Sequence, residues 1–454
     1  MTAMPLIAHG RSADVLAWAD GAPVTAGRFL ADARRLAASF PPSRHVLNAS
    51  ADRYRFAVGL AAALLSDRIS LLPPALTPEM VRQVRQFAPD VFCLTDQAQP
   101  IALPQIAWGE AMAGSTPDTG AFDIPSIPAA NIAAIVFTSG STGLPVAHRK
   151  SWGGLVRSVR SEAQRLCLLD GRRHSIVATV APQHMYGFES TVLIALQSGA
   201  ALTASHPFYP ADICAALARA ERPNILVTTP IHLKALLASG LEIPRPDLVL
   251  SATAPLSPQL ASAVEARLGA PLLEIYGSTE TGQIASRRTA ESPEWQLFPG
   301  VTLAVREGGT WASGGHVEQP IALADEIEVL DGERFLLHGR TADLVNIAGK
   351  RSSLGYLNHQ LNAVPGVVDG AFFMPDDKDA GGDGTTRLMA FVVAPGMKGA
   401  ALLAALRERI DAIFLPRPLV LLDALPRNSN GKLPREALLA LARGHERKGL
   451  PHAQ

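Results

Sequence analysis

The sequence predicts an α/β protein with a large N-terminal domain, built on helix-covered and mostly parallel sheets, and a small C-terminal α+β domain. From about residue 130 to residue 280, short β-prone runs alternate with helical patterns, as is typical of a parallel sheet covered by helices. After Gly339-Arg340 a shorter pattern of strands and one helix follows. A chain of 454 residues is also too long for one ordinary core. We therefore predict domains at residues 1–340 and 341–454.

The predicted elements of the large domain follow this alternation. The strands are Ile132–Val136, Ile176–Val180, Ala200–Ala204, Ile225–Thr229, Leu248–Ser251 and Leu272–Tyr276, and the helices are Phe188–Gln197, Ala211–Ala220, Ile231–Ser239 and Pro258–Leu268. The small domain is predicted to contain strands at Val367–Met374, Leu388–Ala394 and Leu419–Asp423 and a helix at Leu402–Ile413. Residues 1–130 are the least informative part of the sequence. Within them, the apolar run Phe56–Leu65 is too short to span a bilayer and indicates a buried helix.

Charge and cysteine content exclude several classes of protein. Lys plus Arg number 41, as do Asp plus Glu, so no basic excess points to nucleic acid or an anionic membrane as a partner. The cysteines Cys93, Cys167 and Cys214 are too widely spaced for a zinc motif or a disulfide framework. The N-terminal residues show no basic flank followed by a sustained apolar run. We expect a cytoplasmic protein without a membrane span.

The most informative segment is residues 137–145, which read Phe-Thr-Ser-Gly-Ser-Thr-Gly-Leu-Pro and follow the predicted strand Ile132–Val136. Hydroxyl groups and main-chain N–H groups in such a loop can surround phosphate oxygens, and glycine lets the backbone come close. The P-loop of common NTPases requires Gly, four residues, Gly, Lys and Ser or Thr, and residues 137–152 do not supply it. The alternative is a glycine-rich surface turn.

Three further segments follow in a fixed order: Tyr276-Gly277-Ser278-Thr279-Glu280, then Gly339-Arg340 through Gly349-Lys350-Arg351, then Asn428-Ser429-Asn430-Gly431-Lys432. Together with the loop, they resemble the signatures of the adenylate-forming superfamily, which contains acyl- and aryl-CoA synthetases, luciferases and the adenylation domains of peptide synthetases. The resemblance runs from the first third of the chain to its C-terminus. It implies ATP and Mg²⁺ as cofactors and a small mobile C-terminal domain that carries a catalytic lysine.

The resemblance assigns the nucleotide-binding residues. Tyr276 would lie against the adenine, and Asp325 would accept hydrogen bonds from the ribose with help from Arg340. For Asp325 the alternative is a surface carboxylate in a turn. The β- and γ-phosphates would be held by Thr138, Ser139, Gly140, Ser141, Thr142 and Gly143.

The catalytic residues implied by the resemblance are Thr279, Glu280, His184 and Lys432. Glu280 would bind Mg²⁺, since a hard dication takes carboxylate and phosphate oxygens, and Thr279 would contact the α-phosphate. Lys432 would stabilise the charge on the reacting oxygens during adenylation. His184 would line the acyl pocket. The alternatives are a helix cap for Thr279, a solvated lysine for Lys432 and a core histidine for His184.

The same resemblance places the acyl pocket and the path of the thiol. Gly349 would leave room for a phosphopantetheine arm, and the alternative is a plain β-turn. Aromatic and apolar pocket walls are also typical core residues. The predicted walls of the acyl pocket are His184, Tyr186, Phe188, Ala252, Thr253, Ser278 and Ile284.

The chain departs from the family pattern at two places. The phosphate loop usually continues Pro-Lys-Gly, whereas here Val146 and Ala147 follow Pro145. Lys150 and Arg149 are the candidate replacements for the missing lysine. At the hinge, Thr341-Ala342-Asp343 places Ala where Asp or Lys is common. Hinges need permissive backbone angles more than one residue type, so rotation remains the expectation.

The function expected from the resemblance is ATP-dependent activation of an aryl, arylacrylic or aliphatic acid. Pyrophosphate would leave, and the acyl group would pass to CoA or to the phosphopantetheine of a separate carrier protein. Activation of amino acids needs a carboxylate near the helix after His184; the nearest is Glu189, and unless it faces the pocket an acid without a charged amine is favoured. A non-catalytic nucleotide- or acyl-binding homologue is the other alternative. The continuation at 148–152 also resembles short ligases of aryl-polyene pathways.

Overall fold

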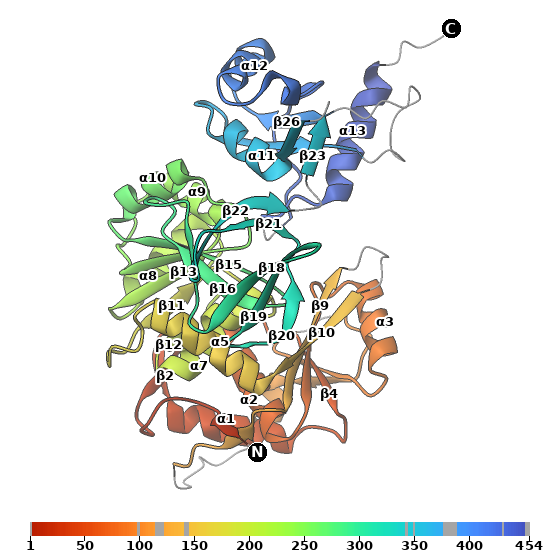
Figure 1. Cartoon of the computed structure of the whole chain (residues 1–454). Helices are drawn as coiled ribbons and strands as arrows, with labels where there is room; N and C mark the ends of the chain where they lie inside the picture. The colour runs from red at the N-terminus through yellow and green to blue at the C-terminus, as the bar shows by residue number, and fades with distance from the viewer. Residues whose placement is uncertain are drawn as a thin grey trace.

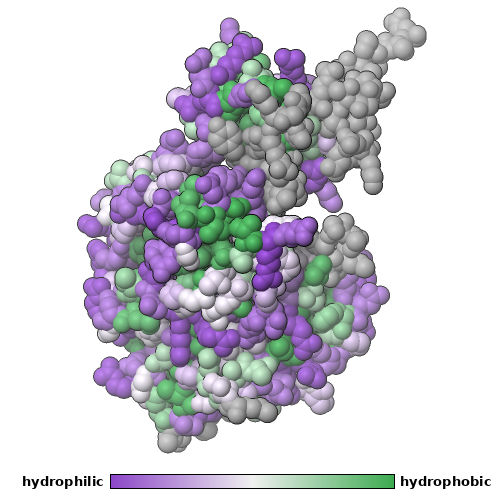
Figure 2. Space-filling view, in the orientation of Figure 1, coloured by the Kyte–Doolittle hydropathy of each residue, from purple (hydrophilic) through white to green (hydrophobic). Residues whose placement is uncertain are grey.

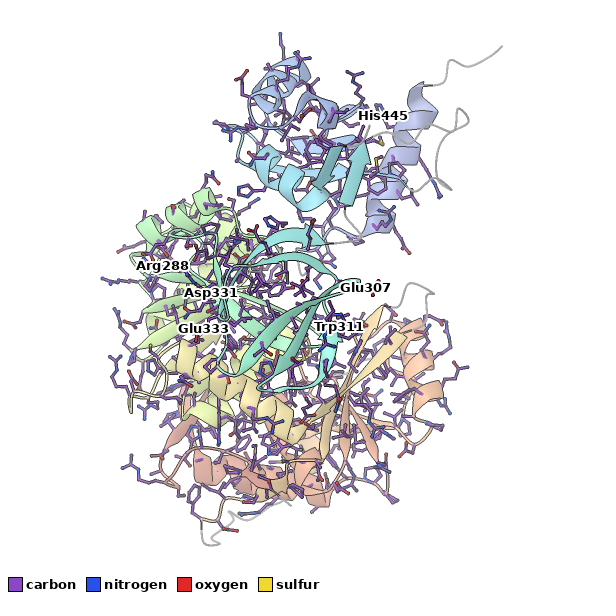
Figure 3. All side chains as sticks on the ribbon, viewed as in Figure 1. Arg288, Glu307, Trp311, Asp331, Glu333 and His445 are labelled. Atoms are coloured by element: carbon purple, nitrogen blue, oxygen red, sulfur yellow. The ribbon has the colours of Figure 1, made fainter. Side chains whose placement is uncertain are left out.

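The computed structural model describes residues 2–97, 100–113, 122–139, 145–340, 344–347, 350–375, 388–428 and 431–449. Two large sheets with helices between and around them make up the first 340 residues, and a smaller group of strands and helices follows at one end (Figure 1). This confirms the predicted α/β class with a large N-terminal and a small C-terminal domain. Side chains fill the space between the layers (Figure 3).

The first large sheet has six strands in the order β10-β9-β5-β4-β6-β7. Its strands are parallel except for the antiparallel pair β9 and β10. The bounds are β4 (His45–Asn48), β5 (Ile69–Leu72), β6 (Phe92–Thr95), β7 (Gln105–Ala107), β9 (Ile132–Ser139) and β10 (Pro145–Ser151). The predicted strand Ile132–Val136 is thus the start of β9, which also includes the first residues of the phosphate loop.

The second large sheet has eleven strands, parallel in its middle and antiparallel at both ends. Its order is β21-β22-β17-β16-β15-β14-β13-β11-β12-β2-β3. The parallel strands are β2 (Val15–Ala19), β12 (Ala201–Thr203), β11 (Ser175–Ala178), β13 (Asn224–Thr228), β14 (Leu248–Ser251) and β15 (Leu272–Ser278). The antiparallel additions are β3 (Ala22–Thr25), β16 (Gly282–Arg287), β17 (Trp295–Leu297), β22 (Arg334–Arg340) and β21 (Asp325–Val329).

The main core lies between the two sheets around the helix predicted at Phe56–Leu65. This helix, α2 (Arg53–Leu65), contacts β4, β5 and β9 of one sheet and β12 of the other. It is buried on nearly every side, as expected for a helix that is apolar all round. Further helices of the large domain are α1 (Ala26–Ala38), α3 (Pro78–Phe87), α4 (Trp108–Ala111), α5 (Trp152–Arg165), α8 (Pro210–Arg219), α9 (Pro230–Ala238) and α10 (Pro258–Leu268).

Two predicted features of the large domain need correction. The helix expected at Phe188–Gln197 consists of α6 (Met185–Gly187), the π-helix η1 (Phe188–Leu193) and α7 (Ile194–Ser198). The strand predicted at Leu272–Tyr276 is longer than expected, because β15 continues to Ser278 in a pairing with β16. The partner strand β16 begins at Gly282, shortly after β15 ends, but the strand–helix alternation before residue 280 gives no sign of this hairpin.

Smaller sheets complete the large domain. β18 (Val301–Arg306), β19 (Gly309–Gly314) and β20 (Val317–Ala322) form an antiparallel sheet on which Figure 3 marks Glu307 and Trp311. β1 (Ala3–Pro5) pairs with β8 (Ser126–Pro128). The face shown in Figure 2 is largely hydrophilic, with apolar side chains in separate patches. Among the described helices, none has the length and apolarity that crossing a bilayer requires.

The C-terminal elements form two cores of their own, one of which unites α11, α12 and β26. The predicted helix Leu402–Ile413 ends at Arg407, and a short 3₁₀ turn follows. The elements are β23 (Leu344–Ile347), β24 (Lys350–Ser353), α11 (Leu354–Asn362), β25 (Asp369–Phe373), β26 (Met389–Val393), α12 (Gly399–Arg407), η4 (Ala412–Phe414), β27 (Leu419–Leu421) and α13 (Arg435–Gly449).

Candidate active site

The residues predicted to bind the nucleoside meet at the antiparallel end of the long sheet. The Tyr276 hydroxyl donates a hydrogen bond to Asp325 Oδ2 at 2.6 Å. The Tyr276 ring packs at centroid distances of 5.5 Å from Trp295 and 5.6 Å from Phe335. Asp325 lies opposite Arg340 in the β21–β22 register. The fold therefore brings together three residues that are up to 64 positions apart in the sequence, Arg340 being placed by its backbone alone.

A second group of polar residues joins the phosphate loop to Glu280. The Thr138 hydroxyl and His148 Nε2 lie 2.9 Å apart, and His148 Nε2 lies 3.6 Å from Glu280 Oε1. Burial lowers the pKa of His148, although the Glu280 charge opposes this shift. His148 was not among the predicted site residues. Because β10 pairs with β9, His148 stands directly opposite Val136 and can reach Thr138, which the sequence alone does not reveal.

The rest of the predicted phosphate loop runs from the end of β9 to the start of β10. Ser139 ends β9 and is placed by its backbone. Gly140, Ser141, Thr142 and Gly143 lie outside the described residues. Of the loop hydroxyls, Thr138 is therefore the one whose contacts are known here.

A tight turn at the end of β15 presents Thr279 and Glu280. The Ser278 main-chain N–H donates to Thr281 Oγ1 at 3.2 Å, and the Thr281 N–H donates to Ser278 Oγ at 3.2 Å. Gly277 makes the turn possible, because a Cβ there would collide with the carbonyl oxygen of Gly282. Burial raises the pKa of Glu280, but hydrogen bonds and the positive charges of His148 and Lys150 outweigh burial and lower it. Glu280 is thus held as a carboxylate.

Glu280 has the chemistry of a magnesium ligand. No group of three or more His, Cys, Asp and Glu side chains suited to a metal occurs within the described ranges. Mg²⁺ is usually held by one or two carboxylates, with substrate phosphates and water as its other ligands. A single carboxylate beside the Thr138 hydroxyl therefore fits an ion that arrives with a polyphosphate.

The predicted catalytic lysine, Lys432, lies near enough to the predicted pocket histidine, His184, for its charge to act on it. Burial lowers the pKa of His184, and the positive charge of Lys432 is the next largest cause. Lys432 belongs to a turn closed by the Asn428 N–H, which donates to the Lys432 carbonyl oxygen at 2.9 Å. In this turn Gly431 has φ +75°, and a Cβ there would lie 3.1 Å from Ile231 of α9. The C-terminal domain thus presents Lys432 to the face of the large domain that carries His184.

Further contacts hold the two domains in this arrangement. Lys234 of α9 donates from Nζ to the carbonyl oxygen of Val368 at 3.2 Å. Next to Val368, Asp369 accepts from Arg427 Nε at 2.7 Å. Arg427 in turn donates to the Gly431 carbonyl oxygen at 2.8 Å. These bonds connect α9 to the turn that carries Lys432.

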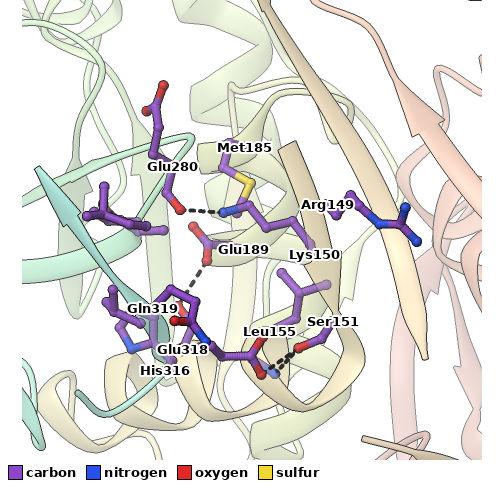
Figure 4. A pocket seen from close by; sticks show the side chains of 16 residues that line it. Arg149, Lys150, Ser151, Leu155, Met185, Glu189, Glu280, His316, Glu318 and Gln319 are labelled. Carbon is purple, nitrogen blue, oxygen red and sulfur yellow. Dashed lines mark hydrogen bonds between the residues drawn. The ribbon is translucent and has the colours of Figure 1, made fainter. Parts of the chain in front are cut away.

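A cavity of about 180 Å³ opens beside Glu280 (Figure 4). Lys150 crosses it, and its Nζ donates to the main-chain oxygen of Glu280 at 2.9 Å. Glu189 of η1 also lines this cavity, so a carboxylate does face the space beside Glu280. The cavity is lined by Arg149, Lys150, Ser151, Gly154, Leu155, Ser158, Met185, Glu189, Glu280, Thr281, Gly282, His316, Val317, Glu318, Gln319 and Ile321.

None of the seven predicted pocket walls lines this cavity, although several are sequence neighbours of residues that do. Phe188 and Ile284 are fully buried in the main core. The Tyr186 hydroxyl donates to the Leu250 carbonyl oxygen at 3.0 Å. Thr253 has φ +78°, which is rare for a β-branched residue and is found most often where function holds the backbone in place. The predicted thiol-path residue Gly349 lies outside the described residues.

Comparisons with known proteins identify relatives of this chain. The family model of AMP-binding enzymes matches residues 43–357. A 4-coumarate–CoA ligase of Rhodobacter capsulatus is 31% identical over 315 residues, which are 68% of this chain and 77% of the relative. The fold matches ATP-bound MatB from Rhodopseudomonas palustris with a TM-score of 0.81, 19% identity and coverage of 96% and 97% of the two chains. It matches MenE of Bacillus subtilis, an o-succinylbenzoate–CoA synthetase bound to its acyl adenylate, with a TM-score of 0.81, 18% identity and coverage of 96% and 98%.

The chain therefore belongs to the AMP-binding family of adenylate-forming enzymes. It is an ATP-dependent acid–thiol ligase that activates a carboxylic acid as an acyl adenylate and converts it to a thioester. This confirms the family, the activity and the use of ATP expected from the sequence.

Proposed function

We propose that the acid is a small aromatic or arylacrylic acid and that the thiol is that of CoA. The size of the cavity beside Glu280 is the main support for a small aromatic or arylacrylic acid. A cavity of about 150 Å³ holds a benzene molecule, so one of about 180 Å³ suits a single ring with a short side chain. A long fatty acid has no room in it. The relative from Rhodobacter capsulatus is a ligase for such an arylacrylic acid, 4-coumarate.

The first half-reaction follows from the grouping of the polar residues. An oxygen of the acid attacks the α-phosphorus of ATP, an acyl–phosphate bond forms, and pyrophosphate leaves. Tyr276, Asp325 and Arg340 would hold the nucleoside, whereas Thr138 and the following loop would hold the β- and γ-phosphates. Bound Mg²⁺ would neutralise phosphate charge, with Glu280 as its protein ligand.

Lys432, Thr279 and His184 would act at the reacting oxygens. A fixed ammonium group stabilises the charge that develops on the carboxylate and α-phosphate oxygens. The proximity of Lys432 to His184 supports this role, since His184 lies next to Met185 at the edge of the cavity. Thr279 would donate to the α-phosphate from the turn that also presents Glu280.

The second half-reaction transfers the acyl group to sulfur and releases AMP. We assign residues 1–340 to the ATP- and acid-binding domain and residues 341–454 to a domain that rotates between the two steps. Gly349 would then border the path of the thiol. The phosphopantetheine of a separate carrier protein has the same thiol arm as CoA, so it is the alternative acceptor.

Amino-acid activation is the second candidate, and Glu189 in the cavity is the observation in its favour. A buried carboxylate could pair with an ammonium group. Lys150 lies in the same cavity, however, and its positive charge repels an ammonium group. The acid without a charged amine is therefore favoured.

The experiment is pyrophosphate exchange into ATP without any thiol, using aryl, arylacrylic, fatty and amino acids. Exchange that is fastest with single-ring aromatic acids is the expected result. Exchange only with fatty or amino acids would contradict the proposed substrate. Thioester formation is then compared with CoA and with a phosphopantetheinylated carrier protein, and a strong preference for the carrier would replace CoA as the acceptor.

A further inference from the structure

We propose that the cavity selects an aromatic acid that carries a phenolic hydroxyl, which is held between the Glu189 carboxylate and the Lys150 ammonium group. This inference rests on the proposed function and deepens it. It makes Glu189 and Lys150 the residues that determine specificity.

The two groups reach the same space from different layers of the fold. Lys150 extends from β10 of the six-stranded sheet, and Glu189 lies on the π-helix η1. Figure 4 shows the two charged ends pointing toward one another across the cavity. Glu280 borders the cavity on the side where phosphate would bind. An acid with its carboxylate at that end would direct the far side of its ring toward Lys150 and Glu189.

Lys150 retains donors for a ligand. An ammonium group has three N–H donors, and one of them is used by the Glu280 main-chain oxygen at 2.9 Å. Burial lowers the pKa of Lys150, and the attraction of Glu189 is the largest opposing cause. A charged donor in a confined cavity makes a strong hydrogen bond with an oxygen acceptor.

Glu189 retains acceptor capacity in the same way. Its side chain is buried, and Oε1 accepts from the Ser158 hydroxyl at 2.9 Å. A carboxylate offers about four acceptor positions. Gly282 leaves the approach to Glu189 open, since a Cβ at Gly282 would lie 2.9 Å from Oε1. Burial raises the pKa of Glu189 to about 7, although Lys150 opposes the shift.

The charges in the cavity select against ionic groups on the far side of the ring. An ammonium group would face Lys150, and a second carboxylate would face Glu189. Glu318 is already paired, since it accepts from Arg157 and from Ser151 at 2.8 Å each. A neutral hydroxyl suits both charged groups, because it can donate a hydrogen bond to Glu189 and accept one from Lys150. We therefore infer a phenol rather than an amine or a dicarboxylate.

The first test compares kcat/KM for pyrophosphate exchange among matched acids. The set comprises cinnamic acid, its 3- and 4-hydroxy forms and its 4-methoxy form, together with the corresponding benzoic acids. A site built around a substrate hydroxyl rejects the analogue that lacks it by large factors, so we expect one hydroxylated acid to exceed its parent at least about a hundredfold. The methyl ether can accept but not donate, and it should be nearly as poor as the parent. Equal rates within about threefold would overturn the inference.

The second test removes the Glu189 carboxylate and the Lys150 ammonium group in turn. Glu189→Gln and Lys150→Met should each lower the ratio of hydroxylated to parent acid at least about tenfold. A variant that is damaged as a whole loses kcat/KM for both acids alike, so the ratio between them does not change. Arg149→Met is the matched control, because Arg149 borders the cavity but its side chain points away from Lys150 (Figure 4), and it should keep the wild-type ratio. An unchanged ratio in Glu189→Gln would overturn the assignment.

Binding of the acid can be measured even where a variant has lost its activity. The hydroxylated acid should raise the melting temperature of the wild type more than its parent does, and Glu189→Gln should remove that difference. Absence of exchange with every acid overturns the proposed function and this inference with it. Exchange that ignores the hydroxyl overturns this inference alone.

Discussion

At the scale of single residues, the position of Lys432 beside His184 has the clearest consequence for catalysis. Lys432→Ala should lower the rate of pyrophosphate exchange about 10²- to 10³-fold, because a fixed cation at the reacting oxygens is lost. Thioester formation from a supplied acyl adenylate should fall far less. The two half-reactions are measured separately, by exchange and by consumption of synthetic adenylate.

The matched control for Lys432 is Lys398→Ala, which removes an exposed lysine that precedes α12 in the same domain. It should stay within about twofold of the wild type in both assays. A similar loss in both half-reactions of Lys432→Ala would assign the residue to domain structure rather than to adenylation.

The hydrogen bond from Tyr276 to Asp325 gives a second prediction for a single residue. Hydrogen bonds to charged groups contribute about 1.5–3 kcal/mol. Tyr276→Phe keeps the ring but removes the donor that orients Asp325. We expect the KM for ATP to rise roughly tenfold, while the KM for the acid stays within about twofold. Steady-state kinetics with each substrate varied in turn provide the test, and an equal rise in both values would contradict it.

At the scale of elements, the turn after β15 depends on Gly277. Its hypothetical Cβ meets the main chain of Gly282 and Gln283 rather than a side chain that could move away. Overpacking of this kind costs about 1–3 kcal/mol. Gly277→Ala should therefore lower the thermal midpoint by several degrees and weaken ATP binding, as measured by calorimetry.

The control for this turn is Gly109→Ala. Gly109 lies in α4, and its hypothetical Cβ has open space around it. The change should leave the thermal midpoint unchanged or slightly higher, because alanine restricts the unfolded chain. If Gly277→Ala and Gly109→Ala have the same thermal midpoint, close backbone approach is not the reason why residue 277 is a glycine.

Elements with local signals could be predicted from the sequence. The bounds of α10 agree with the prediction because Ser257 caps the helix, Pro258 suits its first position and Gly269 ends it at φ +65°. The pairing of β17 with β22, which sets Trp295 opposite Phe335, has no such signal, since the two strands lie far apart in the sequence. The difference between local signals and long-range pairing also applies to the residues of the site. Thr279 and Glu280 lie within one motif, whereas His148 and Glu189 join the site only through the pairing of β9 with β10 and the packing of η1.

At the scale of the whole molecule, the bond between Lys234 and Val368 links α9 to the C-terminal domain in the arrangement that brings Lys432 to His184. A ligand or contact shifts a two-state equilibrium by its differential free energy in the two states. If the bond exists in this arrangement alone, it contributes about 1 kcal/mol, which is a factor of about five. We therefore expect Lys234 to favour the arrangement that brings Lys432 to His184.

Lys234→Met should then lower pyrophosphate exchange about fivefold and leave thioester formation from supplied adenylate unchanged or faster. Methionine keeps the packing of the side-chain stem on α9 while removing the donor. Lys398→Met, on the C-terminal domain, serves as the control for the loss of a lysine away from α9. The opposite effects on the two half-reactions are the decisive observation, because a variant that only weakened the fold would slow both. A parallel decline in both rates would show that the Lys234 contact does not favour one domain arrangement over the other.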